Sequence, residues 1–445
     1  MAHTTTSNGS TGPAGEELRF LSPEEVHAIA ETYGTPTYVY DEASMQANAQ
    51  EMLGLPSAFG LDVRYSLKAC PTAEVVKIFD RLGLIFDASS TWEAIRAIRA
   101  GVDPEKILLT AQEAPFDSQL TGLVLAGMKF DASSLRQLDH FGQHFPGKEV
   151  SVRINPGFGS GMVRRLTSGG PDSSFGIWVD QIPEIERIVK EHQLQVERFH
   201  MHIGSCHDPE VLLRALRVLL DMARTFESAT IIDLGGGYQI KALLDDPEID
   251  HSSWAIRVAQ EMQDFAEETG RRLHLEAEPG TFLVANAGSI VSRVLDVVET
   301  GPDGRTFVKI DAGLTEILRP SYYGARHPLV TVPKGDREPH PFEEISVSGH
   351  CCIAGDVLTT VVGHVEQLGS ALLRRPEPDD YLVVERAGGY CSSMAMKNFN
   401  SFPEAPEVLR RADGSTTLIR RRQTIEQLLQ NELDLAPVLE SGRVS

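Results

Sequence analysis

The chain has 445 residues, 41% of them hydrophobic and 23% charged, which provides apolar surface for a core and excludes collagen-like and fully disordered classes. With 63 acidic and 41 basic residues, its formal net charge of −22 repels nucleic acid and anionic membrane surfaces. We find no apolar run near the ~18 residues that span a bilayer and no signal-peptide pattern, so we expect a cytoplasmic protein. The five cysteines form no CxxC pair, which argues against a disulfide framework and a structural metal site.

The first sixteen residues are rich in Ser, Thr, Gly and Pro, and we predict that residues 1–16 are a disordered tail. From about residue 60, short β-rich runs alternate with amphipathic stretches such as 91–100 and 209–226. This alternation is typical of parallel βα units, and eight of them predict an α/β fold with a (β/α)8 TIM-like barrel over residues 41–290. The eight strands are expected at 63–66, 84–86, 107–109, 128–130, 150–154, 199–203, 230–233 and 273–278.

After residue 290 the pattern changes to β-rich runs separated by Gly, Pro and Asp turns, without long helical stretches. We therefore predict a second, mostly antiparallel β domain, made of residues 17–40 and 291–435. The strand expected at 37–40 fits either domain by its sequence alone. The other runs lie at 289–298, 306–310, 344–347, 357–365, 381–386 and 416–422.

Polar residues follow the ends of six predicted barrel strands, where the active sites of such barrels lie. Any one of them is most simply explained as a solvated loop residue or a helix cap. Six in register on six strands instead predict a functional site at the mouth of the barrel. These residues are Lys68, Asp87, Arg153, Asn155, His202, Ser205, Gly235, Gly236, Gly237 and Glu278.

Two of these motifs favour the chemistry of a phosphorylated aldehyde. Lys68 follows an apolar strand, and a lysine amine among apolar neighbours has a lowered pKa and can form a Schiff base. Alone, it is more simply explained as a surface lysine at a strand end. The three glycines of 235–237 leave backbone N–H groups free for an anion such as phosphate, although a tight turn would need the same residues.

A histidine and a glutamate complete the pattern. His202 is expected on its strand, facing the barrel mouth, where a flat imidazole can stack on an aromatic ring, while His200 is assigned to the core. Glu278 is placed to keep a pyridine nitrogen protonated, with Glu276 one layer deeper. The set describes pyridoxal 5′-phosphate rather than a nicotinamide, because no GxGxxG motif follows the first strand.

Ordered motifs across both domains resemble those of the fold-type III pyridoxal-phosphate decarboxylases, most closely the bacterial diaminopimelate decarboxylases. The resemblance runs from about residue 20 to 430 and implies the alanine racemase/ornithine decarboxylase-like fold. The matching motifs are YSLKAC at 65, VRINPGFGSG at 152, SSFGIW at 173, HMHIGS at 200, DLGGGY at 233, EAEPGTFLVANAG at 276, DAGLTEILRPSYYGA at 311, CCIAGDVL at 351, AGGYCSSM at 387 and LIRRRQTIEQLL at 418.

The resemblance implies roles for individual residues. Lys68 looks like the Schiff-base lysine, and the cofactor-binding set is expected to be Lys68, Asp87, Arg153, His202, Ser205, Gly235, Gly236, Gly237, Glu278, Gly280 and Tyr390. Arg319 and Tyr323 match a pair that holds the distal carboxylate of the substrate. Such enzymes are homodimers with shared active sites, in which Cys352 of one subunit would protonate the carbanion formed in the other. A thiol has a reference pKa suited to this transfer.

Two departures from the family pattern concern the substrate pocket. Thr281 stands where the family carries an arginine, and Ile353 where it carries a glutamate. Each lost charge-assisted contact is worth roughly 1.5–3 kcal/mol, so we expect a decarboxylase for an amino acid less charged at its far end than diaminopimelate. The alternatives are a genuine meso-diaminopimelate decarboxylase of lysine biosynthesis, a racemase on the same barrel and an inactive paralogue that acts as a binding protein. No metal is expected.

Overall fold

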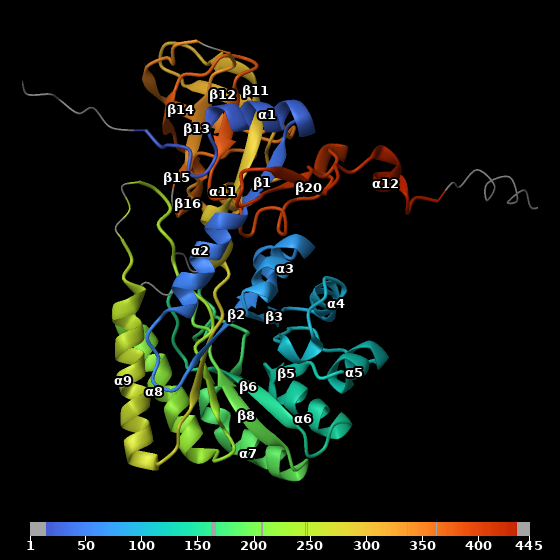
Figure 1. Cartoon of the computed structure of the whole chain (residues 1–445), viewed down its shortest axis with the longest axis vertical. Helices are drawn as coiled ribbons and strands as arrows, with labels where there is room; N and C mark the ends of the chain where they lie inside the picture. Colours follow the sequence, from blue (N-terminus) through green and yellow to red (C-terminus); the bar gives the residue numbers. More distant parts are fainter. Residues whose placement is uncertain are drawn as a thin grey trace, which may run out of the picture.

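The computed structural model describes residues 15–161, 166–205, 208–244, 246, 248–335, 337–361 and 363–433, which form two domains stacked along the long axis of the molecule (Figure 1). The tail predicted at 1–16 lies outside these residues except for Gly15 and Glu16. A carboxylate oxygen of Glu16 accepts a hydrogen bond from the backbone N–H of Leu244 at 3.2 Å. The end of the second domain predicted at 435 also lies outside the described residues.

The lower domain in Figure 1 is a closed barrel of eight parallel strands, as the sequence predicts. Around the barrel the strands follow the order β5-β4-β3-β2-β10-β9-β8-β6, and pairing of β5 with β6 closes it. A short strand, β7 (Ile177–Trp178), pairs with β6 outside this ring. The barrel strands are β2 (Leu61–Ser66), β3 (Ile85–Ala88), β4 (Ile107–Leu109), β5 (Lys129–Ala132), β6 (Glu149–Asn155), β8 (Gln195–His200), β9 (Ile231–Asp233) and β10 (His274–Ala277).

Each predicted barrel strand overlaps an observed one, but β8 lies earlier than the predicted 199–203. Its last ladder contact runs from the N–H of Met201 to the carbonyl oxygen of Asp233, at 3.0 Å. Gly204, with φ at +117°, then turns the chain. The alternation of apolar and polar residues continues past the strand, and this misplaced its end. His202 therefore lies in the loop after β8, not on the strand.

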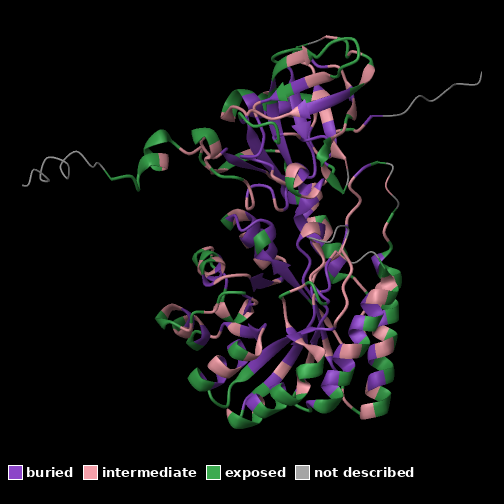
Figure 2. Ribbon diagram, turned by 180° about the vertical axis from the view of Figure 1, so that it is seen from behind, coloured by how far each residue is buried: buried purple, intermediate pink, exposed green. Residues whose placement is uncertain are grey.

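Helices cover the outside of the barrel and turn their exposed residues to solvent, while the strands are buried (Figure 2). Polar caps begin several of them. The hydroxyl of Ser90, for example, accepts from the N–H of Glu93 at the start of α4. These helices are α2 (Glu42–Leu53), α3 (Ala73–Arg81), α4 (Thr91–Arg99), α5 (Ser118–Leu125), α6 (Leu135–His144), α7 (Ile182–Glu191), α8 (Pro209–Thr225), α9 (His251–Thr269) and the short α10 (Thr281–Val284).

The second domain is built on a mixed sheet around the long strand β11 (Gly288–Glu299). It is mostly antiparallel, as predicted, with the parallel pairs β1–β19 and β12–β14 added. β1 (Thr37–Asp41) pairs with β11 and so lies in this sheet rather than in the barrel. Its other strands are β12 (Thr306–Ile310), β13 (Leu329–Val332), β14 (Phe342–Ser348), β17 (Ala371–Arg374), β18 (Tyr381–Val384), β19 (Glu407–Arg410) and β20 (Thr416–Arg420).

The second domain also differs from the sequence-based expectation in detail. The run at 357–365 contains β15 (Thr360–Val361) and the start of β16 (His364–Leu368), and Gly363, with φ at +76°, directly precedes β16. Strands β13, β17 and β19, of four residues each, were not predicted. The helices of this domain, α1 (Pro23–Tyr33), α11 (Arg319–Tyr323) and α12 (Ile425–Leu429), were missed as well.

A loop of the second domain returns to the mouth of the barrel. After β18, the N–H of Tyr390 donates to the carbonyl oxygen of Ala69 at 2.8 Å. The hydroxyl of Ser393 donates to the carbonyl oxygen of Lys68, also at 2.8 Å. These contacts join the loop after β18 to the turn after β2, so residues of both domains meet at the carboxyl ends of the barrel strands.

Candidate active site

A cavity of about 850 Å³ lies at the mouth of the barrel and takes its walls from both domains. Eight basic and four acidic side chains are among the described residues that line it, so this region is cationic in a chain of negative net charge. Most of the predicted site residues meet here: Lys68, His202, Ser205, Gly236, Gly237, Glu278, Gly280, Thr281, Arg319, Tyr323 and Tyr390.

Lys68 lies in a single 3₁₀ turn, Leu67–Ala69, directly after β2. Its Nζ is 3.4 Å from Oδ2 of Asp87, a buried residue of β3. Burial alone would lower the pKa of the amine, but the negative charges of Asp87 and Glu278 and the nearby Tyr390 outweigh it and raise the pKa. The predicted lowering of this pKa was therefore wrong for the cofactor-free protein, because the neighbours of Lys68 are acidic rather than apolar.

His202 presents a neutral ring to the cavity. Burial, followed by the positive charges of Arg153 and Lys68, lowers the pKa of its imidazole to about 3. The N–H of Gly236 donates to Nδ1 at 3.2 Å, which fixes the ring and leaves its proton on Nε2. A neutral, oriented imidazole can stack on an aromatic ring without adding charge to it.

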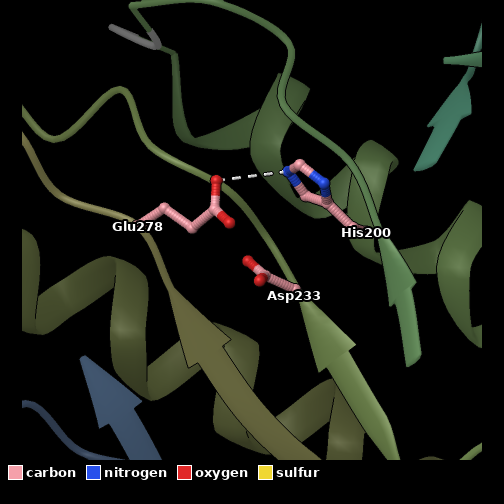
Figure 3. A group of neighbouring side chains, drawn as sticks. All are labelled: His200, Asp233 and Glu278. Carbon is pink, nitrogen blue, oxygen red and sulfur yellow. Dashed lines mark ion pairs between the residues drawn. The ribbon is translucent and has the colours of Figure 1, made fainter. Parts of the chain in front are cut away.

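Glu278 lines the cavity and is paired with a buried histidine, His200 (Figure 3). Nε2 of His200 is 3.3 Å from Oε2 of Glu278, and Nδ1 is 2.8 Å from Oδ2 of Asp131. Although burial lowers the pKa of His200, the two carboxylates raise it to about 10. Burial raises the pKa of Glu278, but His200 more than offsets this, so the carboxylate stays ionised. Its Oε1 is buried without a hydrogen-bond partner and remains free to accept one.

Ligand atoms of His200, Asp233 and Glu278 lie within 4.8 Å of one another, close enough to hold a metal ion (Figure 3). The imidazole of His200, however, keeps its proton between two carboxylates and has no lone pair to offer a cation. His200 and Glu278 are better explained as an ion pair that orients Glu278, while Asp233 accepts a hydrogen bond from the N–H of Gly235. The absence of a metal stays a prediction.

The glycine loop after β9 is packed too closely for side chains. A Cβ on Gly236 would lie 2.7 Å from the carbonyl oxygen of Glu278, and one on Gly235 would lie 2.7 Å from Cβ of His202. Gly235 and Gly237 also adopt left-handed φ angles of +67° and +106°. Bare backbone is therefore required here, at the rim of the cavity.

Some predicted site residues do not line this cavity. Asp87, Arg153 and Gly235 stand behind its wall, the first two as buried charges near Lys68 and His202. Cys352 and Ile353 are exposed and are not among the described residues that surround the cavity of their own chain.

Sequence reasoning also missed residues that do line the cavity, among them Glu93 and Arg386. Glu93 also belongs to a helix cap, in which its carboxylate accepts from the N–H of Ser89 at 2.8 Å, so its sequence position alone does not indicate a place in the cavity. Arg386 follows a strand of the second domain, where no pattern marks it. Only the fold brings these side chains to the barrel mouth.

Comparison with known proteins gives the family. A family model described as pyridoxal-dependent decarboxylase, pyridoxal binding domain, matches residues 44–285. The chain is 35% identical to the diaminopimelate decarboxylase of Streptomyces coelicolor over 428 residues, which cover 94% of each chain. The chain belongs to the pyridoxal-dependent decarboxylases. Its cofactor is pyridoxal 5′-phosphate and its reaction is that of a carboxy-lyase, as predicted.

Further relatives agree with this family membership. The diaminopimelate decarboxylase of Escherichia coli K12 is 32% identical, with 93% of this chain and 97% of that one covered. A crystal structure of diaminopimelate decarboxylase superposes with a TM-score of 0.85 at 32% identity, over 93% of this chain and 97% of that chain. The predicted fold class is thereby confirmed. None of the helices in the described ranges combines the length and apolar character needed to cross a membrane.

Proposed function

We propose that this decarboxylase acts on meso-diaminopimelate. Its high-coverage relatives are diaminopimelate decarboxylases, which supports this substrate more than the less charged one expected from the sequence. The observation that carries the proposal is one cavity that joins Lys68 and Glu278 at the barrel mouth to Arg319 and Tyr323 of the second domain. A substrate with a carboxylate at each end can reach both parts.

The residues around the cavity fit pyridoxal 5′-phosphate. Lys68 has its side chain 45% exposed, so its amine is available for covalent attachment of the cofactor aldehyde. The unpartnered Oε1 of Glu278 can accept from a pyridinium nitrogen. The N–H groups of Gly235 and Gly236 already donate to Asp233 and His202, so the phosphate would be received by Gly237 together with Ser205 and Tyr390. When bound, this cofactor withdraws electrons from the bond between Cα and the departing carboxylate.

The chain's own residues would prepare that step in distinct ways. Glu278, kept ionised by His200, would hold the ring nitrogen protonated and so preserve its electron demand. His202 would fix the plane of the ring by stacking, because the N–H of Gly236 sets its orientation. With the ring fixed, the scissile carboxylate can be held perpendicular to it.

On the side of the cavity formed by the second domain, we assign Arg319 and Tyr323 to the distal carboxylate of the substrate. The guanidinium of Arg319 lies 5.7 Å from the ring centroid of Tyr390, near the proposed phosphate site. Its planar fork suits a carboxylate. Thr281 lines the same cavity without a charge, and this observation keeps a less charged amino acid as the second candidate substrate.

We also propose a homodimer in which Cys352 of one subunit returns a proton to the substrate carbon in the other. Cys352 and the half-exposed Ile353 lie outside the cavity of their own chain, which is compatible with a place in a partner's site. The cytoplasmic location and the lack of nucleic-acid partners stay predictions.

A substrate panel tests the proposal. Purified enzyme loaded with pyridoxal phosphate is given meso-diaminopimelate, L-lysine, L-ornithine and L-arginine in turn, and carbon dioxide release is measured. We expect release from diaminopimelate, and its loss in the Lys68→Ala variant. Release from another amino acid alone would favour the second candidate, and no release from any would favour the inactive paralogue.

A further inference from the structure

Arg386 is a buried cation in the wall of the active-site cavity. It follows β18 and is only 7% exposed, yet it lines the same cavity as Lys68 and Arg319. Its φ of +61° is in the left-handed region, which a long side chain rarely adopts. A strained backbone that presents a buried charge to a cavity often marks a functional position.

No carboxylate of the described residues pairs with this guanidinium, and its Nε is buried without a hydrogen-bond partner. The adjacent carboxylate of Glu385 is occupied by Ser289 and by the N–H of Arg19. That of Asp246, which attracts Arg386 at longer range, accepts from two backbone N–H groups. A buried charge without a partner is costly. Because the described residues supply no counter-anion for Arg386, we expect a bound ligand to supply it.

Arg319 is the second cation of this region. Its Nη1 donates only a long bond, 3.4 Å, to the carbonyl oxygen of Gly389, and its Nε is also unpartnered. Burial, and then the positive charges of Arg319 and Arg19, lower the pKa of Arg386 to about 9. Two neighbouring guanidinium groups repel each other until an anion lies between them, and a carboxylate can accept hydrogen bonds from both.

We propose that Arg386 binds the distal carboxylate of the substrate together with Arg319 and is thus a specificity-determining residue. This inference rests on the proposed function, since it takes the dicarboxylic substrate as its ligand. The phosphate of the cofactor is the competing anion. The loop after β9, with Ser205 and Tyr390, already offers that phosphate a place, so the distal carboxylate is the anion left for Arg386 and Arg319.

The test compares wild-type holoenzyme with the Arg386→Met and Arg386→Lys variants. Binding of pimelate, a seven-carbon diacid, is measured beside that of L-lysine, which has no distal carboxylate. We expect Arg386→Met to weaken pimelate binding about tenfold or more, the value of one charge-assisted contact, and to leave L-lysine binding unchanged. The KM for diaminopimelate should rise similarly, with affinity for pyridoxal phosphate unaltered.

Unchanged pimelate affinity in Arg386→Met would overturn the inference, and so would a loss confined to cofactor affinity, which would assign the residue to the phosphate. If Arg386→Met does not fold, Arg386→Lys decides. It keeps the charge but not the planar fork, so pimelate should bind several-fold more weakly, and unchanged binding would again overturn the inference. Pimelate binding that depends on Arg386 in an enzyme inactive on diaminopimelate would refute the proposed function and leave this inference standing.

Discussion

Glu276 and Glu278 lie two residues apart but differ in how completely their carboxylates are paired. Glu276 in β10 is bound by two buried guanidinium groups, those of Arg64 and Arg198, at 2.8 and 2.9 Å. Glu278, two residues later, has one histidine partner and one oxygen without any. The first arrangement satisfies a carboxylate completely, whereas the second leaves it ready to bind a ligand.

We expect Glu278→Gln to lower kcat by roughly 10²-fold. A neutral amide, unlike a carboxylate, cannot keep the ring nitrogen of the cofactor protonated, so the ring would withdraw electrons less strongly. Steady-state carbon dioxide release measures this. The matched control is Glu276→Gln, which breaks a buried ion pair and should lower the free energy of unfolding by about 3 kcal/mol or more. Equal losses of kcat in two stably folded variants would contradict the distinction between these glutamates.

His200 gives the cofactor-free protein a pH dependence of known sign. Its pKa is raised to about 10 in the folded protein, against about 6.5 when unfolded, so the folded state binds the proton more strongly. This contribution to stability is fully present below pH 6.5 and is lost as the pH rises toward 10. The His200→Gln variant should therefore lose less stability than wild type between pH 6.5 and 9.5, as measured by urea unfolding.

His202 provides the matched control, because its shift has the opposite sign. With its pKa lowered to about 3, it remains neutral in the folded protein while the unfolded chain takes up a proton below pH 6.5. Its contribution therefore destabilises the protein as the pH falls from 6.5 toward 3. His202→Gln should relieve this acid loss and leave the alkaline one unchanged. An alkaline loss of the same size in wild type and His200→Gln would refute the assignment.

The loop after β9 can be tested through its glycines. Gly236→Ala would place a Cβ 2.7 Å from the carbonyl oxygen of Glu278, so the loop that borders the cavity must shift. We expect it to weaken binding of pyridoxal phosphate about tenfold, the value of a lost charge-assisted contact, as measured by absorbance titration. The control is Gly270→Ala at the end of α9, where φ is +72° but no atom lies within 4 Å. It should cost about 1 kcal/mol of stability and no cofactor affinity.

The same elements explain what the sequence could predict. Eight β-rich runs separated by amphipathic stretches indicate the barrel, because the spacing of apolar residues within each segment shows whether it is a strand or a helix. The predicted barrel also places Lys68 and Glu278 at its mouth, because the carboxyl ends of parallel strands lie at the same end of the barrel. The pKa of Lys68 was misjudged because its main charged partner, Asp87, lies on the neighbouring strand β3, whereas the sequence interpretation considered the residues next to Lys68 in the chain. Arg386 was missed for the same reason: its position near the cavity depends on a loop from the second domain.

Several large apolar side chains are exposed on the surface of the single chain. Ile353 is 50% exposed beside Cys352, and α12 extends from the second domain with Ile425 and Leu429 on one side, exposed by 55% and 43% (Figure 1). Residues four apart lie on the same helix face. Together with the proposed role of Cys352, these surfaces favour a homodimer in which each active site needs both subunits.

Mixing inactive variants tests the shared site. Lys68→Ala and Cys352→Ala should each be inactive alone, but a dimer of one with the other keeps one site with both residues intact. Random exchange of subunits should restore about a quarter of the wild-type carbon dioxide release, because half of the dimers then hold one working site of two. Lys68→Ala mixed with Glu278→Gln is the control, since both residues belong to the same barrel and no mixed dimer gains a complete site. If the first mixture stays inactive although pull-down of one tagged variant recovers the other, each site is complete within one chain, and another group must return the proton.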